Sequence, residues 1–256
     1  GFSPGLRRMM AKSGSELSFE RAGNLLEELA GVQVTDKEVE RVSERIGDDI
    51  AQWQQAQVDW AMQTERPDAE IDQAPATLYI AQDATGVPVL RRETEGRKGK
   101  AADGQARTRE VKLGALFTQS TPEQQGHPMR DPYSTTYVGK IETAESFGPR
   151  LYSEALRRGL EKASRVVVIG DGAPWIWNLA DEHFPGAIQI LDFYHAKEKL
   201  CGLAKILHPE NPAARQAWLD PLAELLWEGQ IPALLQRLRR LRSHPAEGKT
   251  TVEYFQ

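Results

Sequence analysis

The hydrophobic positions of this chain follow three successive patterns, each typical of a different kind of structure. In the first quarter, apolar residues recur every three to four positions, as in amphipathic helices. In the middle, short β-branched runs alternate with helical stripes, and the last part is Leu-rich at helical spacing throughout. We therefore expect an N-terminal helical region at 1–75, an α/β core at 76–203 and an all-helical segment at 204–256.

The N-terminal region contains two predicted helices. Residues 1–17 are rich in Gly, Ser and basic residues, and we expect them to be poorly ordered. Residues 18–30 have helical spacing, and Thr35 and Glu38 form a capping box for a second helix that continues to about Trp53. The pair is compatible with a helix-turn-helix that binds DNA, but the spacing favours an ordinary helical hairpin.

In the core, predicted strands and helices alternate after a Pro-containing linker at 66–75. A turn at 84–86 joins the first two strands as a hairpin. Because proline disrupts helix interiors, Pro149 places the start of the first core helix near Phe147. The predicted strands are 77–83, 87–90, 110–118, 134–138, 166–169 and 187–191, and the predicted helices are 147–162, 175–183 and 196–207.

Three of the predicted strands end in an aspartate, namely Asp83, Asp171 and Asp192. Open α/β sheets place their sites at the carboxyl ends of strands, so these carboxylates are candidate site residues. Each could instead serve as a turn or helix-cap residue. His195 follows Asp192 by three residues, so the two side chains can meet where the next helix begins.

The order of the elements is compatible with an α/β RNase H-like core, which has a mixed sheet and flanking helices. The first and fourth strands of that fold lie side by side, which would bring Asp83 and Asp171 to about 4–6 Å from each other. Paired carboxylates suit Mg²⁺ (or Mn²⁺), which can activate a water or a 3′-hydroxyl for attack at phosphorus. A Rossmann-like fold also places acids at strand ends, but no Gly-rich phosphate-binding motif is present.

Net charge bears on DNA binding, because the 32 basic and 37 acidic residues leave a net charge of −5. Contacts with DNA must therefore come from local basic patches. Residues 91–112 hold eight Lys or Arg against four Asp or Glu, and the end of the last predicted helix is also basic. Both could be solvated surfaces instead. The candidate contacts are Arg91, Arg92, Arg97, Lys98, Lys100, Arg107, Arg109, Lys112, Arg237, Arg239, Arg240 and Arg242.

Composition excludes several classes of protein. Cys201 is the single cysteine, so neither a disulfide nor a cysteine-based zinc site can form within one chain. No apolar run is long enough for a membrane span, and no signal peptide is visible. We expect a soluble cytoplasmic protein, and the start at Gly1 suggests a missing N-terminus.

Several motifs resemble those of bacterial insertion-sequence DDE transposases of the ISKra type, in family order over roughly residues 15–256. The blocks Gly-Asp-Gly-Ala-Pro-Trp-Ile-Trp and Asp-Phe-Tyr-His-Ala are the most specific. The matching segments are Ile80–Gly86, Arg109–Gly114, Ser134–Val138, Gly170–Trp177 and Leu191–Ala196.

This resemblance implies an RNase H-like nuclease that cuts transposon ends and joins them to target double-stranded DNA, acting as a homo-oligomer. Asp83 and Asp171 match the first two metal-binding acids, and Asp192 and His195 match a supporting Asp-x-x-His motif. The third acid, a Glu, follows the helical insertion and would lie beyond residue 256. A catalytically inactive DNA-binding fragment and an unrelated α/β hydrolase or nucleotide-binding protein remain the alternatives, and the last requires Asp83 and Asp171 to be far apart.

Overall fold

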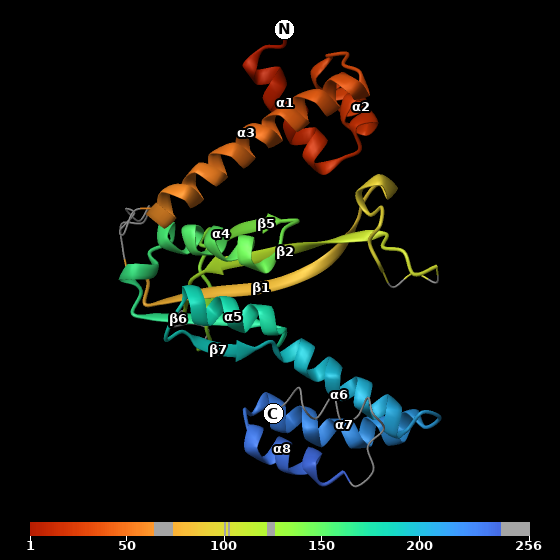
Figure 1. The fold of residues 1–256 in the computed structure, drawn as a ribbon, viewed down its shortest axis with the longest axis vertical. Helices are drawn as coiled ribbons and strands as arrows, with labels where there is room; N and C mark the ends of the chain where they lie inside the picture. The colour runs from red at the N-terminus through yellow and green to blue at the C-terminus, as the bar shows by residue number, and fades with distance from the viewer. Residues whose placement is uncertain (64–73, 100, 102, 122–125, 242–256) are drawn as a thin grey trace. The chain divides into compact units, whose positions relative to one another are not determined.

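The structure is a computed structural model that describes residues 1–63, 74–99, 101, 103–121 and 126–241 (Figure 1). The chain divides into two compact units, Gly1–Pro67 and Asp68–Gln256. Most of the predicted linker, Lys100, Arg242 and the C-terminal residues lie outside the described residues.

The first unit consists of three helices, α1 (Pro4–Glu16), α2 (Phe19–Ala30) and α3 (Asp36–Gln63). The expectation that residues 1–17 are poorly ordered was wrong. Ser3 caps α1 by accepting a hydrogen bond from the Leu6 N–H, and Met10 is fully buried between the helices. The cap and the packing of Met10 against the other helices stabilise a helix in a segment of polar composition.

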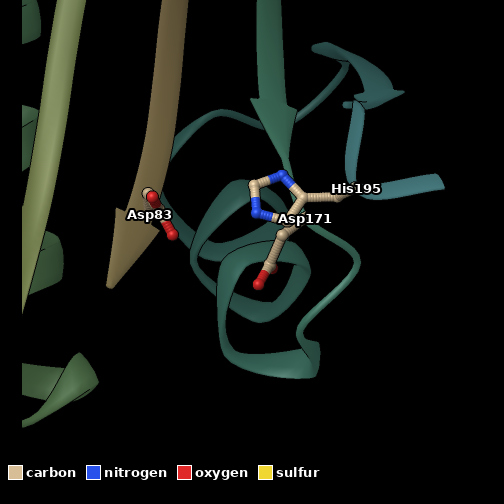
Figure 2. Close-up of side chains that lie close together, drawn as sticks. All are labelled: Asp83, Asp171 and His195. Atoms are coloured by element: carbon tan, nitrogen blue, oxygen red, sulfur yellow. The ribbon is translucent and has the colours of Figure 1, made fainter. Parts of the chain in front are cut away.

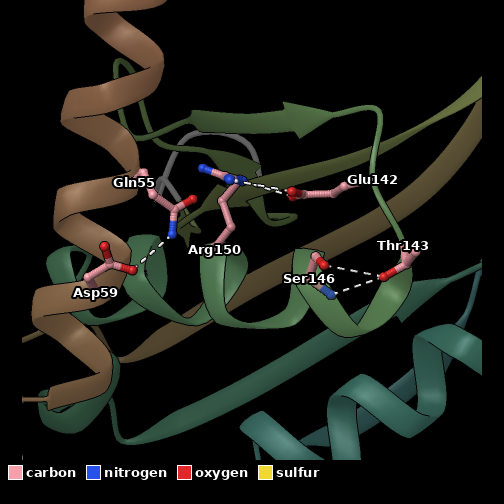
Figure 3. A network of polar contacts seen from close by, with 6 residues as sticks. All are labelled: Gln55, Asp59, Glu142, Thr143, Ser146 and Arg150. Carbon is pink, nitrogen blue, oxygen red and sulfur yellow. Dashed lines mark hydrogen bonds and ion pairs between the residues drawn. The ribbon is translucent and has the colours of Figure 1, made fainter.

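The capping box at the start of α3 is confirmed. The Thr35 N–H donates to the Glu38 carboxylate at 2.8 Å, and the Glu38 N–H donates to the Thr35 hydroxyl at 3.3 Å. Further along the same helix, the Gln55 amide donates to the Asp59 carboxylate (Figure 3). The helix extends ten residues beyond the predicted Trp53.

The second unit is built on a five-stranded mixed sheet with the strand order β5-β2-β1-β6-β7. β1, β6 and β7 run parallel, while β2 pairs antiparallel with both β1 and β5. The strands are β1 (Thr77–Pro88), β2 (Thr108–Phe117), β5 (Thr136–Lys140), β6 (Arg165–Gly170) and β7 (Ile188–Leu191), with a separate pair of β3 (Gln119–Ser120) and β4 (Met129–Arg130).

The predicted hairpin at 84–90 was wrong, because β1 continues through the expected turn to Pro88. Its last residues pair with the start of β2, as Gly86 does with Glu110 and Pro88 with Thr108. The turn signal Ala84-Thr-Gly86 is overridden by backbone hydrogen bonds to a strand more than twenty residues away. Turn propensity depends on neighbouring residues alone, so it does not predict pairing with a distant strand.

Two helices, α4 (Ala144–Arg157) and α5 (Pro174–His183), pack against one face of the sheet (Figure 1). α4 begins three residues before the predicted Phe147, because Thr143 caps it by accepting a hydrogen bond from the Ser146 N–H (Figure 3). Pro149 therefore lies inside the helix, near its beginning, and Arg150 just after it forms an ion pair with Glu142 at 2.8 Å. The shared core contains Leu78, Ile80, Leu116, Val138, Phe147, Leu151, Val168 and Ile176.

The last described part of the chain is helical, as predicted. It comprises α6 (Phe193–Leu207), α7 (Pro212–Trp227) and α8 (Ile231–Arg239). These helices share a leucine core of their own, with Leu200, Leu203, Leu222, Leu234 and Leu238 buried. Of all the helices described, none combines the length and the hydrophobicity needed to cross a membrane.

Candidate metal centre

The sheet register brings Asp83 and Asp171 together. β1 and β6 pair in parallel as far as Ala81 and Ile169, so two residues further along each chain Asp83 and Asp171 lie level with each other. Asp83 does not end its strand as predicted. It lies inside β1, which continues past Asp83 to Pro88. The neighbouring strand β6 ends at Gly170, so Asp83 lies level with the turn that follows β6.

Tight local turns hold both carboxylates. Gly172 has φ +93°, a left-handed conformation that favours glycine, and this sharp turn lets Asp171 accept a hydrogen bond from the Ala173 N–H at 2.8 Å. Ala173 occupies the N-cap position of α5, so Asp171 does not cap that helix. Asp83 accepts a hydrogen bond from the Ala84 N–H at 2.7 Å.

His195 is the third member of the group, and it comes from the first turn of α6. Figure 2 shows its imidazole ring beside the carboxylates of Asp83 and Asp171, each residue arriving from a different element. The ligand atoms of the three residues all lie within 4.8 Å of one another. The distance that the paired-carboxylate hypothesis predicts is therefore observed, and a fold in which Asp83 and Asp171 are far apart is excluded.

Asp192 orients His195 and caps the helix that carries it. Its carboxylate oxygen accepts the His195 N–H at 3.0 Å and lies 3.0 Å from the imidazole Nδ1. The helix-cap interpretation of Asp192 is thus confirmed. Because Nδ1 is directed at a carboxylate, Nε2 is the nitrogen left for a ligand.

The three residues fit a divalent metal ion. Two carboxylates and one imidazole form an accepted ligand set, and a Mg²⁺–oxygen bond of about 2.1 Å allows ligands on one ion to be about 4 Å apart. Asp83 is exposed and the other two side chains are half-buried, which leaves room for waters and a substrate oxygen on the ion. The arrangement can therefore polarise a phosphate and activate a nucleophile.

Asp83, Asp171 and His195 line a cleft of about 310 Å³ on the face of the sheet away from α4 and α5. Its floor is formed by small residues of the central strands, Ala81 and Ala115, and Leu113 and Tyr137 form part of its wall. Tyr137 was not among the candidate site residues. No clear sequence signal identifies it, because strand pairing alone places Tyr137 in one row with Ala115 and Ala81.

The predicted DNA-contacting residues fall into several groups. Four of them line one cavity of about 630 Å³ in the loop between β1 and β2, and all four are exposed, namely Arg91, Arg92, Arg97 and Lys98. Arg107 forms an ion pair with Asp103, and Arg109 is half-buried in β2. Arg237, Arg239 and Arg240 are exposed at the end of α8.

Lys112 differs from the other basic residues of its segment. It is only 6% exposed, its ammonium group pairs with Glu110, and it lies 4.5 Å from the centroid of the Trp175 ring. Burial against an aromatic face and a carboxylate removes it from the surface. A contact between Lys112 and DNA stays a prediction, and it would require the side chain to leave these partners.

Comparison with known proteins gives little. No protein-family model and no curated protein matches the chain. Among solved structures, the chain is similar to that of the Drosophila P element transposase strand transfer complex, with 11% sequence identity and a TM-score of 0.35. The match covers 100% of this chain and 64% of that one, so the chain spans less than two thirds of its length. A likeness this weak carries no argument for function.

Proposed function

We propose that this chain carries the nuclease core of a DDE-type DNA transposase, which cuts DNA phosphodiester bonds and transfers the 3′-ends to new DNA with Mg²⁺ or Mn²⁺. The observation that supports this most directly is the convergence of Asp83, Asp171 and His195 in one open cleft. The mixed sheet with flanking helices is compatible with an RNase H-like fold. The sequence blocks that resemble ISKra-type transposases surround these same residues.

Each residue of the centre has a role that follows from its contacts. Asp83 and Asp171 would hold the metal, and His195 would add a nitrogen ligand through Nε2. Asp192 would accept a hydrogen bond from the Nδ1–H group, which fixes the tautomer and the ring orientation. A bound divalent ion would polarise the scissile phosphate and lower the pKa of the attacking water or 3′-hydroxyl.

The loop between β1 and β2 is the proposed contact for the DNA backbone. β1 continues five residues past Asp83 to Pro88, which is about 17 Å of extended chain. Arg91, Arg92, Arg97 and Lys98 therefore follow the strand that carries a metal ligand. Guanidinium and ammonium groups at this separation can hold phosphates flanking the scissile one.

The resemblance implies a third acid, a Glu, and two carboxylates with one histidine would bind metal less tightly than a set that includes it. The same resemblance implies a homo-oligomer on paired DNA ends. The second candidate function is a catalytically inactive DNA-binding fragment. The four clustered basic residues of the β1–β2 loop favour it, because they require no metal.

The deciding experiment is nicking of a DNA duplex in Mg²⁺ or Mn²⁺ by this chain and by a version extended at its C-terminus, each with an Asp171→Asn control. Cleavage that is lost on substitution supports the transposase nuclease. Salt-sensitive binding by both versions, with no cleavage by either and no effect of Asp171→Asn, supports the binding fragment instead.

A further inference from the structure

Exposed aromatic rings lie on two of the elements that line the cleft, β5 and α6. Tyr137 of β5 is 73% exposed and lines the cleft itself. Tyr194, in the first turn of α6 between Asp192 and His195, is 77% exposed. Single exposed apolar side chains need no explanation, but rings gathered around one cleft indicate a binding surface.

The rings beside His195 form a preassembled group. Phe193 lies edge-on to Tyr194, with ring centroids 5.5 Å apart, and edge-on to Trp227 of α7, with centroids 5.3 Å apart. Phe193 is half-buried and so supports the other two, while Trp227 is 69% exposed. Rings fixed in this way offer flat apolar surface at a small cost in side-chain entropy.

Between Tyr137 and Asp83, the open face of the sheet carries the small side chains of Ala115 and Ala81. Tyr137 pairs with Ala115, which pairs with Ala81, so the three residues form one row across the sheet. Asp83 lies two residues along β1 from Ala81, on the same face. Two strand spacings of about 4.8 Å therefore separate the Tyr137 backbone from the Ala81 backbone by about 10 Å.

The cleft is open to solvent and has room for one nucleotide unit. Its volume of about 310 Å³ is at the lower end of the range for small-ligand sites. Aromatic rings bind bases of any sequence by stacking, but the bases must be unpaired to offer their faces.

We infer that the cleft takes a DNA strand whose bases next to the scissile phosphate are unpaired, one stacking on Tyr137 and another on the Tyr194–Trp227 surface. This inference rests on the proposed function and specifies the form of its substrate. The duplex must open locally, or the strand must already be single, before the phosphate reaches the metal. The stacked bases then fix the phosphate between the two groups of rings.

The test measures binding in EDTA, so that it does not depend on cleavage. Fluorescence anisotropy compares the full chain on a fully paired duplex and on the same duplex with a short mismatched bubble. We expect tighter binding to the bubble, and a loss of about tenfold in that preference with Tyr194→Ala or Tyr137→Ala. Tyr194→Phe and Trp227→Phe, which keep a ring, should retain it.

The control is Tyr133→Ala, which removes a fully exposed tyrosine that does not line the cleft. Thermal melting shows that each variant is folded. Equal affinity for both DNAs, or alanine variants that match the wild type on the bubble, would overturn the inference. If Asp171→Asn still abolishes nicking in that case, the proposed function stands and only the stacking role is lost.

Discussion

The two faces of the five-stranded sheet use alternate residues of the same strands for opposite purposes. On the face covered by α4 and α5, Leu78, Ile80 and Val168 have no exposed surface. On the other face, Leu113 and Ile190 are at least two-fifths exposed, and the candidate metal ligand Asp83 borders the cleft. Successive strand residues point to opposite sides, so one segment such as β1 can supply core and site together.

This difference teaches where stability and function are separable. Because the covered face carries the packing, substitutions there should change the free energy of unfolding. Substitutions of exposed residues on the open face should change metal or DNA binding with little effect on folding. Phe117 and Val167 lie on that face too, but they are buried and belong with the packed residues. The following predictions test that separation, beginning with the largest expected effect.

Phe147→Ala on the covered face should cost about 3–5 kcal/mol of unfolding free energy, because Phe147 is fully buried and its removal leaves a cavity. Tyr137→Ala on the open face should cost less than about 0.5 kcal/mol, as for other exposed residues. Urea denaturation measures both. Similar losses for the two variants would mean that the open face is also packed against something.

Gly114→Ala should destabilise the protein by about 1–3 kcal/mol through overpacking. A Cβ on Gly114 would lie 2.5 Å from Leu151 Cδ1 and 2.9 Å from Val138 Cγ2, both buried on the covered face. The matched control is Gly139→Ala on the open face, where the nearest atom is Leu113 Cδ2 at 2.9 Å. Leu113 is exposed and can move, so the control should cost much less in the same denaturation experiment.

Gln82→Met should stabilise the protein by about 1 kcal/mol. Gln82 is 4% exposed, and among the described residues its amide nitrogen and oxygen have no hydrogen-bond partner. Methionine has a similar shape and no buried polar group to satisfy. Thermal melting decides the outcome, and a lowered melting temperature would show that the amide has a partner after all, such as an ordered water.

His183, which is buried near the covered face, should make the free energy of unfolding depend on pH. Its side chain is 9% exposed and packs against Gly148, and burial lowers the pKa of His183 below its usual value of 6.5, with Glu182 opposing this weakly. The unfolded chain then binds more protons than the folded one, so stability is fully present above pH 6.5 and falls as the pH drops below it. Melting curves between pH 5 and 8 should show this slope, and His183→Phe should flatten it.

Secondary structure was predictable where the signals are local. The helical stripes, the capping box at Thr35 and the buried run 166–169 identified elements that the structure contains. Predictions failed where a distant partner decides the outcome. The expected turn at 84–86 is part of β1 because β2 pairs with it. Residues 4–16 form a helix because Met10 packs against buried residues of α2 and α3.

For the site, the sequence determined which side chains are available, namely the carboxylates of Asp83, Asp171 and Asp192 and the imidazole of His195. Only the tertiary structure decided which of them share a cleft and which serves as a cap. Strand register brings Asp83 level with Asp171, and the α6 cap directs Asp192 at His195. The burial of Lys112 was also hidden, because charge patterns along a chain do not show which side chains face a neighbouring helix. Residue identity is a local property, whereas the distance between two carboxylates depends on hydrogen bonds between strands that lie far apart in the sequence.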